Sequence, residues 1–226
     1  MNWFDRLVFT FFNTEVAARY LPDIVKGMGV TVALGLCVAA TGLALGLLLA
    51  VLRTLHRPWL SLPIVAFVDI LRALPPLVVI IVLFFAFPYI DLAMSSFTAT
   101  WIALSLVLAA YAEESIWAGL LALPRGQLEA ARSTGLTWWQ SMRRVLLPQA
   151  LRIAVPALTN RVISTTKNTA LGSVVALNEV LNNAQSASSN AGNPTPLTLG
   201  AVAYLAIFLP VVLSARWLET RWRWKR

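Results

Sequence analysis

The chain has 226 residues, of which 58% are hydrophobic and 12% are charged, and its mean hydropathy is +0.73. This composition excludes an ordinary soluble domain and is typical of an integral membrane protein. The formal charge of +8 does not indicate a nucleic-acid-binding protein, because the basic residues flank apolar stretches as membrane topology signals do. The single cysteine, Cys37, excludes a disulfide framework, and no metal-ligand cluster occurs in the sequence.

The first twenty residues mix aromatic and charged side chains, which predicts an amphipathic helix on the outer surface of the membrane. We expect no removable signal peptide, because no short apolar core with a small-residue cleavage site opens the chain. Five membrane-spanning helices are predicted next, since about 20 apolar residues cross roughly 30 Å of hydrocarbon. They cover residues 27–52, 62–88, 98–121, 150–176 and 196–216. The predicted fold is an all-α integral membrane protein with a single transmembrane domain over residues 1–226.

Glycines and polar residues mark contacts and turns along these spans. Gly42 and Gly46 are four residues apart in the first span, where they let a neighbouring helix approach closely. The polar segment 182–196 precedes the last span and predicts an exposed outer turn.

The basic residues predict the orientation of the chain in the membrane. Loops that alternate between the two sides collect most of them on one side: Arg53, Arg57, Arg125, Arg132, Arg143, Arg144, Arg152, Arg216, Arg221, Arg223, Lys225 and Arg226. The opposite side carries Arg6, Arg19 and Lys26. The positive-inside rule therefore places the N-terminus outside and the C-terminus in the cytoplasm.

A basic amphipathic insert, residues 124–148, lies between the third and fourth spans on the predicted cytoplasmic side. Glu129 would lie in the first turn of a helix, where a carboxylate suits the helix dipole. Ala130 and Ala131 allow a partner surface to come close, and Gly135 permits a chain reversal. A second short helix would set an apolar face beside two cations: Trp138, Trp139, Met142, Arg143 and Arg144. Composition alone leaves two alternatives open, a helix lying on anionic lipid and a segment that binds a protein partner.

Ionisable side chains at membrane depth are costly and therefore mark candidate sites. Asp69 and Arg72 are three residues apart and share a helix face, so we favour a buried ion pair over contact with a substrate. Glu113 and Glu114 are adjacent and point about 100° apart on a helix, so one of the two is expected to face an internal cavity.

The fourth span is the most polar. Arg161, Thr165, Asn168 and Gly172 follow i, i+4, i+7, i+11 spacing and would form one stripe of an α-helix. Hydrogen bonds between helices are the alternative explanation. A stripe headed by arginine exceeds what packing requires, so we interpret it as the wall of a substrate passage. The planar guanidinium of Arg161 suits a carboxylate.

Residues 129–148, EAARSTGLTWWQSMRRVLLP, contain EAA, three residues, Gly, nine residues, an aliphatic residue, any residue and Leu-Pro. This pattern resembles the EAA loop in permease subunits of ATP-binding-cassette (ABC) importers. Further stretches resemble the branch that imports polar amino acids and opines: RALPPL at 72–77, YAEE at 111–114, LPRGQ at 123–127, PQALR at 148–152, PALTN at 156–160 and KNTAL at 167–171. The resemblance runs from about residue 22 to residue 216.

The resemblance implies a type I ABC importer permease fold in the bacterial cytoplasmic (inner) membrane, with residues 124–148 as a cytoplasmic coupling helix. It also implies an ABC ATPase dimer, a second permease subunit that is identical or homologous, and an extracytoplasmic substrate-binding protein. The residues expected to couple the chain to the ATPase are Glu129, Ala130, Ala131, Gly135, Arg143 and Arg144. No GxxxxGK[ST] phosphate loop occurs, so we expect no cofactor in this chain, with ATP and Mg bound by the partner.

Glu114 matches the carboxylate in the Tyr-x-x-Glu run of that family, which assigns it to the substrate passage. Glu113 would then meet Arg125 or a lipid headgroup. The resulting hypothesis is that Arg161 receives a substrate carboxylate while Glu114 balances the amino group, with Thr165 and Asn168 lining the passage.

Two other classes of protein remain as alternatives. A membrane-embedded enzyme would use Glu113 and Glu114 as acid and base. However, the lone His56 lies in a short basic loop, and no Ser/His pair is present. An ion-coupled carrier would explain intramembrane carboxylates. Five spans are too few for two inverted repeats, and the cytoplasmic insert would have no role. We therefore expect a permease without a catalytic residue of its own.

Overall fold

The computed structural model describes residues 2–55 and 57–222, with side chains up to residue 217 in the second stretch. Every regular element in these residues is a helix, so the predicted all-α fold is confirmed. Predictions that involve His56, Arg223, Lys225 and Arg226 fall outside the described residues, and so does the side chain of Arg221.

The described residues group into two compact units, each assembled from separate segments of the chain. The first unit comprises Met1–Val38, Pro76–Leu104 and Thr165–Leu213, and the second comprises Ala39–Pro75, Ser105–Ser164 and Ser214–Arg226. Each unit therefore depends on contacts between segments that lie far apart in the sequence. The single domain over residues 1–226 stays a prediction.

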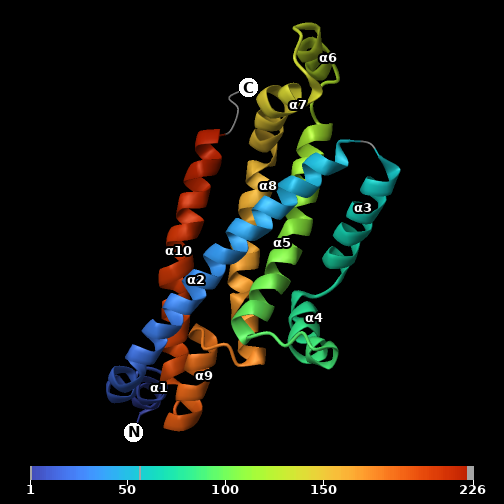
Figure 1. The fold of residues 1–226 in the computed structure, drawn as a ribbon. Helices are drawn as coiled ribbons and strands as arrows, with labels where there is room; N and C mark the ends of the chain where they lie inside the picture. The colour runs from blue at the N-terminus through green and yellow to red at the C-terminus, as the bar shows by residue number, and fades with distance from the viewer. Residues whose placement is uncertain (1, 56, 223–226) are drawn as a thin grey trace. The chain divides into compact units, whose positions relative to one another are not determined.

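The N-terminal part of the chain forms α1 (Trp3–Phe11) and α2 (Thr14–Arg53) (Figure 1). α1 is amphipathic and has no buried residue, so the predicted amphipathic helix is confirmed, while its place on the outer surface stays a prediction. Between the two helices, the backbone N–H of Asn13 donates to Thr195 Oγ1 at 3.1 Å. α2 includes the whole of the predicted first span, 27–52, and begins well before it.

The second predicted span, 62–88, is wrong as one continuous helix. α3 (Pro58–Ala73) ends, and the chain resumes as α4 (Pro76–Ile81), a π-helical turn (Val82–Ala86) and a 3-10 turn (Phe87–Ile90) (Figure 1). Leu74 is extended, with φ −83° and ψ 135°, because a residue before proline is disfavoured in the α region. Pro76 lacks a backbone N–H, which is tolerated in the first turn of a new helix. Apolar length alone therefore overestimated the continuity of this segment.

The remaining elements complete the two units. They are α5 (Ser96–Leu121), α6 (Gly126–Ser133), α7 (Trp138–Ser141), a π-helical turn (Met142–Leu146), α8 (Leu147–Lys167), a 3-10 helix (Asn168–Val175), α9 (Val180–Ala191) and α10 (Thr195–Trp222).

Three helical stretches in the described chain are long and apolar enough to cross a membrane: Trp3–Arg53, Ser96–Leu121 and Thr195–Trp217. A fourth is counted if the broken pair Pro58–Ala73 and Pro76–Ile90 is one span. The predicted span 150–176 corresponds to α8 and the 3-10 helix after it, and it contains Asn160, Arg161 and Lys167. These polar residues lower the hydropathy of the segment 150–176, which is not among the stretches that are long and apolar enough. The count of five spans therefore stays a prediction.

The polar segment 182–196 was expected to be an exposed turn, but most of it is helical. α9 begins after Glu179, whose carboxylate accepts a hydrogen bond from the backbone N–H of Asn182 at 2.7 Å. Glu179 is fully buried, and the hydroxyl of Tyr204 donates to its second oxygen at 2.5 Å. A side-chain N-cap of this kind satisfies one of the free N–H groups at a helix start. Glu179 lies before the polar segment 182–196, so the composition of that segment does not indicate the helix cap.

In the second unit, the predicted close approach of a helix at the glycines of α2 is confirmed, and the neighbouring helix is α5. A Cβ atom added at Gly46 would lie 2.5 Å from Ala112 Cβ and 3.0 Å from the backbone nitrogen of Glu113. At Gly42 it would lie 2.8 Å from Leu108 Cβ. Only a hydrogen atom fits at these positions, so the two backbones meet closely. This close crossing sets how α2 and α5 align, so that the C-terminal end of α2 lies opposite the carboxylates of α5.

Candidate functional site

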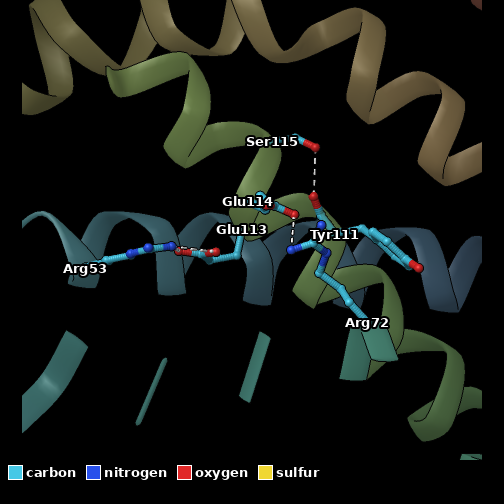
Figure 2. Close-up of polar contacts among 6 residues, drawn as sticks. All are labelled: Arg53, Arg72, Tyr111, Glu113, Glu114 and Ser115. Carbon is cyan, nitrogen blue, oxygen red and sulfur yellow. Dashed lines mark hydrogen bonds and ion pairs between the residues drawn. The ribbon is translucent and has the colours of Figure 1, made fainter. Parts of the chain in front are cut away.

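The buried carboxylate of the site is Glu113, which pairs with Arg53 at the end of α2 (Figure 2). Arg53 Nη1 donates to Glu113 Oε1 at 3.0 Å and to Oε2 at 3.3 Å. The Glu113 side chain is 0% exposed, and the Arg53 guanidinium also lies 4.5 Å from the centroid of the Trp117 ring. The prediction that Glu113 meets Arg125 is wrong, because Arg125 is exposed at the start of α6 while the α2–α5 crossing places Arg53 opposite Glu113.

The second carboxylate, Glu114, pairs with Arg72 from α3 at 2.5 Å (Figure 2). The predicted Asp69–Arg72 pair is therefore wrong. Asp69 is exposed and has no ion pair among the described residues. Arg72 is directed toward α5, since its guanidinium also lies 5.9 Å from the ring of Tyr111 on that helix. The partner of Arg72 is thus Glu114 on the facing helix α5, and not Asp69, which lies about one turn earlier on α3.

Tyr111 connects these groups to the fourth predicted span. The guanidinium carbon of Arg161, on α8, lies 4.2 Å from the centroid of the Tyr111 ring, within the range of a cation–π contact. We call Arg72, Tyr111, Glu114 and Arg161 the arginine–tyrosine cluster. It holds two guanidinium groups and one carboxylate, and all four residues belong to the second unit.

The other residues predicted to line the passage, Thr165 and Asn168, do not both lie on the α-helix that carries Arg161. The stripe that begins at Arg161 assumed a continuous α-helix, but α8 ends at Lys167 and Asn168 begins a 3-10 helix. A 3-10 helix has 3.0 residues per turn, so the spacing of a regular α-helical stripe ends there. Thr165 is buried and Asn168 is partly buried, and both belong to the first unit. Their place in a passage stays a prediction.

The segment 124–148 folds into α6, α7 and the π-helical turn that follows. Gly135 has φ +84°, the left-handed conformation that the predicted chain reversal requires. Thr137 then caps α7: its hydroxyl accepts from the backbone N–H of Gln140 at 3.3 Å, and the Gln140 side chain accepts from the backbone N–H of Thr137 at 2.8 Å. This reciprocal capping box restarts the helix directly after the reversal.

The predicted coupling residues differ in exposure. Glu129, Ala130, Arg143 and Arg144 are exposed, whereas Ala131 is 6% exposed and packs inside the chain. Met142 is also buried, so the apolar face predicted for the second short helix divides between the interior and the surface. A surface hollow beside these cations is lined by Trp139, Gln140, Arg143 and Arg144.

Sequence reasoning missed three members of the site. Arg53 was counted as a cytoplasmic topology signal, although it lies seven residues after Gly46 and so two turns along the same helix face. Tyr111 and Trp117 were not assigned roles. Tyr111 precedes Glu114 by three residues, a spacing that places the two side chains one turn apart.

Residues 42–224 match the family described as the inner membrane component of binding-protein-dependent transport systems. The match covers well over half of the chain, and the chain belongs to this family. It is therefore a multi-pass protein of the inner membrane and a non-enzymatic permease subunit, with ATP hydrolysis carried out by a partner ATPase. The alternatives of an ion-coupled carrier and a membrane-embedded enzyme are not favoured.

Two relatives from Bacillus subtilis (strain 168) show the same class. The probable glutamine ABC transporter permease protein GlnP is 37% identical, over 78% of this chain and 83% of its own. The probable amino-acid ABC transporter permease protein YckA is 35% identical over 77% of each chain. Among solved structures, a crystal structure of an amino acid ABC transporter with histidines has a TM-score of 0.81 at 28% identity, covering 90% of this chain and 96% of that chain. The predicted permease fold is thereby confirmed.

Proposed function

We propose that this chain moves a polar amino acid, or a related opine, inward across the membrane as one permease subunit of an ABC importer. Relatives at 35% and 37% identity are named as a probable amino-acid permease and a probable glutamine permease, which supports this cargo class. The arginine–tyrosine cluster is the observation that carries the proposal, because it offers both a guanidinium and a carboxylate on helices predicted to span the membrane. An amino acid presents the complementary pair of charges.

Within this proposal, Arg161 receives the substrate carboxylate and Glu114 balances the amino group. Arg161 is exposed and therefore accessible, and its planar fork matches a carboxylate. Glu114 is already paired with Arg72, so binding of an ammonium group requires a partner exchange at that carboxylate. Thr165, in the last turn of α8, and Asn168, at the start of the 3-10 helix, stay predicted members of the passage.

The coupling step takes place at residues 124–148. We assign the ATPase contact to the exposed part of this segment, where Ala130 offers a small surface and Arg143 and Arg144 offer cations. The assembly comprises two permease subunits, identical or homologous, an ATPase dimer that holds ATP and Mg, and an external binding protein. The N-terminus lies outside and the C-terminus lies in the cytoplasm, as the positive-inside rule requires. Nucleotide in the ATPase and the binding protein outside then favour different states of the passage.

Proteoliposomes that contain the permease, its ATPase and the binding protein test the proposal. Amino-acid uptake is expected to require ATP, and a large side chain in Ala130→Trp is expected to abolish both uptake and co-purification of the ATPase. Ser189→Trp is the control, because Ser189 is also exposed but lies on α9, outside the coupling segment, and the ATPase should still co-purify. Uptake driven by an ion gradient without the ATPase would contradict the proposal.

A further inference from the structure

We infer that the arginine–tyrosine cluster selects an amino acid that carries a second carboxylate, such as an acidic amino acid or a dicarboxylic opine. The inference deepens the proposed function and rests on it. It begins from the charges of the second unit. Arg53 and Glu113 neutralise each other in a separate pair. Arg72, Arg161 and Glu114 leave the cluster with one positive charge in excess.

The excess charge has no ion-pair partner among the described residues. Arg161 forms neither an ion pair nor a hydrogen bond within the part of the chain that the structure describes, and its contact is the face of Tyr111. Its guanidinium therefore keeps its donors available for a ligand. Arg72 supports the same conclusion, because its Nε is buried without a hydrogen-bond acceptor while Nη1 donates to Glu114. Both arginines thus offer donors that an additional acceptor would satisfy.

The identity of the missing acceptor follows from charge balance. A neutral zwitterion brings one carboxylate and one ammonium group, so it leaves the positive excess unchanged. A cationic side chain increases the excess, and a second carboxylate removes it. Uncompensated charge at membrane depth is costly. A substrate that carries a second carboxylate therefore gains most from binding at this site. Both guanidinium groups lie near the Tyr111 ring, at 5.9 Å for Arg72 and 4.2 Å for Arg161, where two carboxylates of a single small molecule can reach them.

Equilibrium binding to the permease–ATPase complex in lipid nanodiscs tests this inference directly. The complex is prepared without nucleotide and without the external binding protein, so that selectivity comes from the membrane subunits. Radiolabelled L-glutamate and L-glutamine are the decisive probes, because they share a shape and differ in charge. Glutamate is expected to bind about tenfold more tightly, as one charge-assisted hydrogen bond allows. L-arginine is expected to bind most weakly.

Variants of Arg161 separate charge from packing. Arg161→Gln is expected to bring the affinities for glutamate and glutamine together, whereas Arg161→Lys keeps the preference for glutamate because it keeps the charge. Arg161→Glu is expected to reverse the order in favour of arginine. Arg152→Gln is the matched control, since Arg152 is an exposed arginine on the same helix but outside the cluster, and the preference should not change.

The inference is overturned if the wild-type complex binds glutamine or arginine as tightly as glutamate, binds no glutamate at millimolar concentration, or keeps its preference in Arg161→Gln. ATP-driven uptake of another amino acid by the same preparation, with the binding protein added, would then leave the proposed function standing. Loss of all ATP-driven uptake would contradict the proposed function as well.

Discussion

The Arg53–Glu113 and Arg72–Glu114 ion pairs use adjacent carboxylates of α5 but have opposite environments. The side chain of Glu113 is 0% exposed, and that of Glu114 is 43% exposed. The first pair, which we call the sealed pair, lies where α2 crosses α5 at close range, since an added Cβ at Gly46 would lie 3.0 Å from the backbone nitrogen of Glu113. The second pair lies beside Tyr111, whose ring also contacts Arg161, and Arg161 has no ion pair or hydrogen bond among the described residues. A sealed pair locks two helices together, and an open pair is able to exchange partners with a substrate.

The largest effect is expected from breaking the sealed pair. Glu113→Ala leaves the Arg53 guanidinium, whose side chain is 21% exposed, without its carboxylate, which costs about 3 kcal/mol. The melting temperature of the purified complex, followed by tryptophan fluorescence, measures this loss. A double variant, Arg53→Met with Glu113→Leu, removes both charges and is expected to recover most of the stability. Equal destabilisation in the single and double variants would show that packing, and not charge pairing, holds this contact.

A smaller loss is expected from forcing the two helices apart. Gly46→Ala introduces a methyl group 2.5 Å from Ala112 Cβ, a clash with another helix that costs about 1–3 kcal/mol. Gly29→Ala is the matched control on the same helix, because an added Cβ there meets nothing within 4 Å. The control is expected to be neutral or slightly stabilising, since alanine favours a helix by up to about 1 kcal/mol over glycine. Thermal unfolding of both variants in the same detergent checks the difference.

The contrast between the two pairs also shows what the sequence reveals. The glycine spacing of Gly42 and Gly46 predicted a close crossing, and the reversal at Gly135 was expected from its position between two short helices, because both are local properties of the backbone. The partners of Glu113 and Arg72 were predicted wrongly, because each lies on another helix and depends on how helices pack. Local spacing favoured Asp69 for Arg72, and tertiary structure replaced it with Glu114.

The coupling segment offers a third, more local test, away from both pairs. Thr137→Ala removes the hydroxyl that accepts the backbone N–H of Gln140, and loss of such an N-cap costs about 1 kcal/mol. Because α7 has four residues, the change should stay local. Hydrogen exchange is expected to become faster in residues 138–141, with exchange in α5 unaffected. Thr137→Ser retains the hydroxyl and should restore protection; if it does not, the capping bond is not what holds α7.

The smallest effect on stability is expected at the open pair, although its effect on transport is large. Glu114→Gln removes a charge from an ion pair that solvent partly screens, so the stability lost is at most about 1 kcal/mol. The same substitution releases Arg72 and removes the carboxylate proposed to balance the substrate amino group, so uptake should fall while the melting temperature holds. Asp69→Asn is the control, since Asp69 is an exposed carboxylate on the helix of Arg72 and has no ion pair in the described part of the chain. If Glu114→Gln lost as much stability as Glu113→Ala, the two pairs would have the same structural role, and Glu114 would not be free to exchange its partner for a substrate.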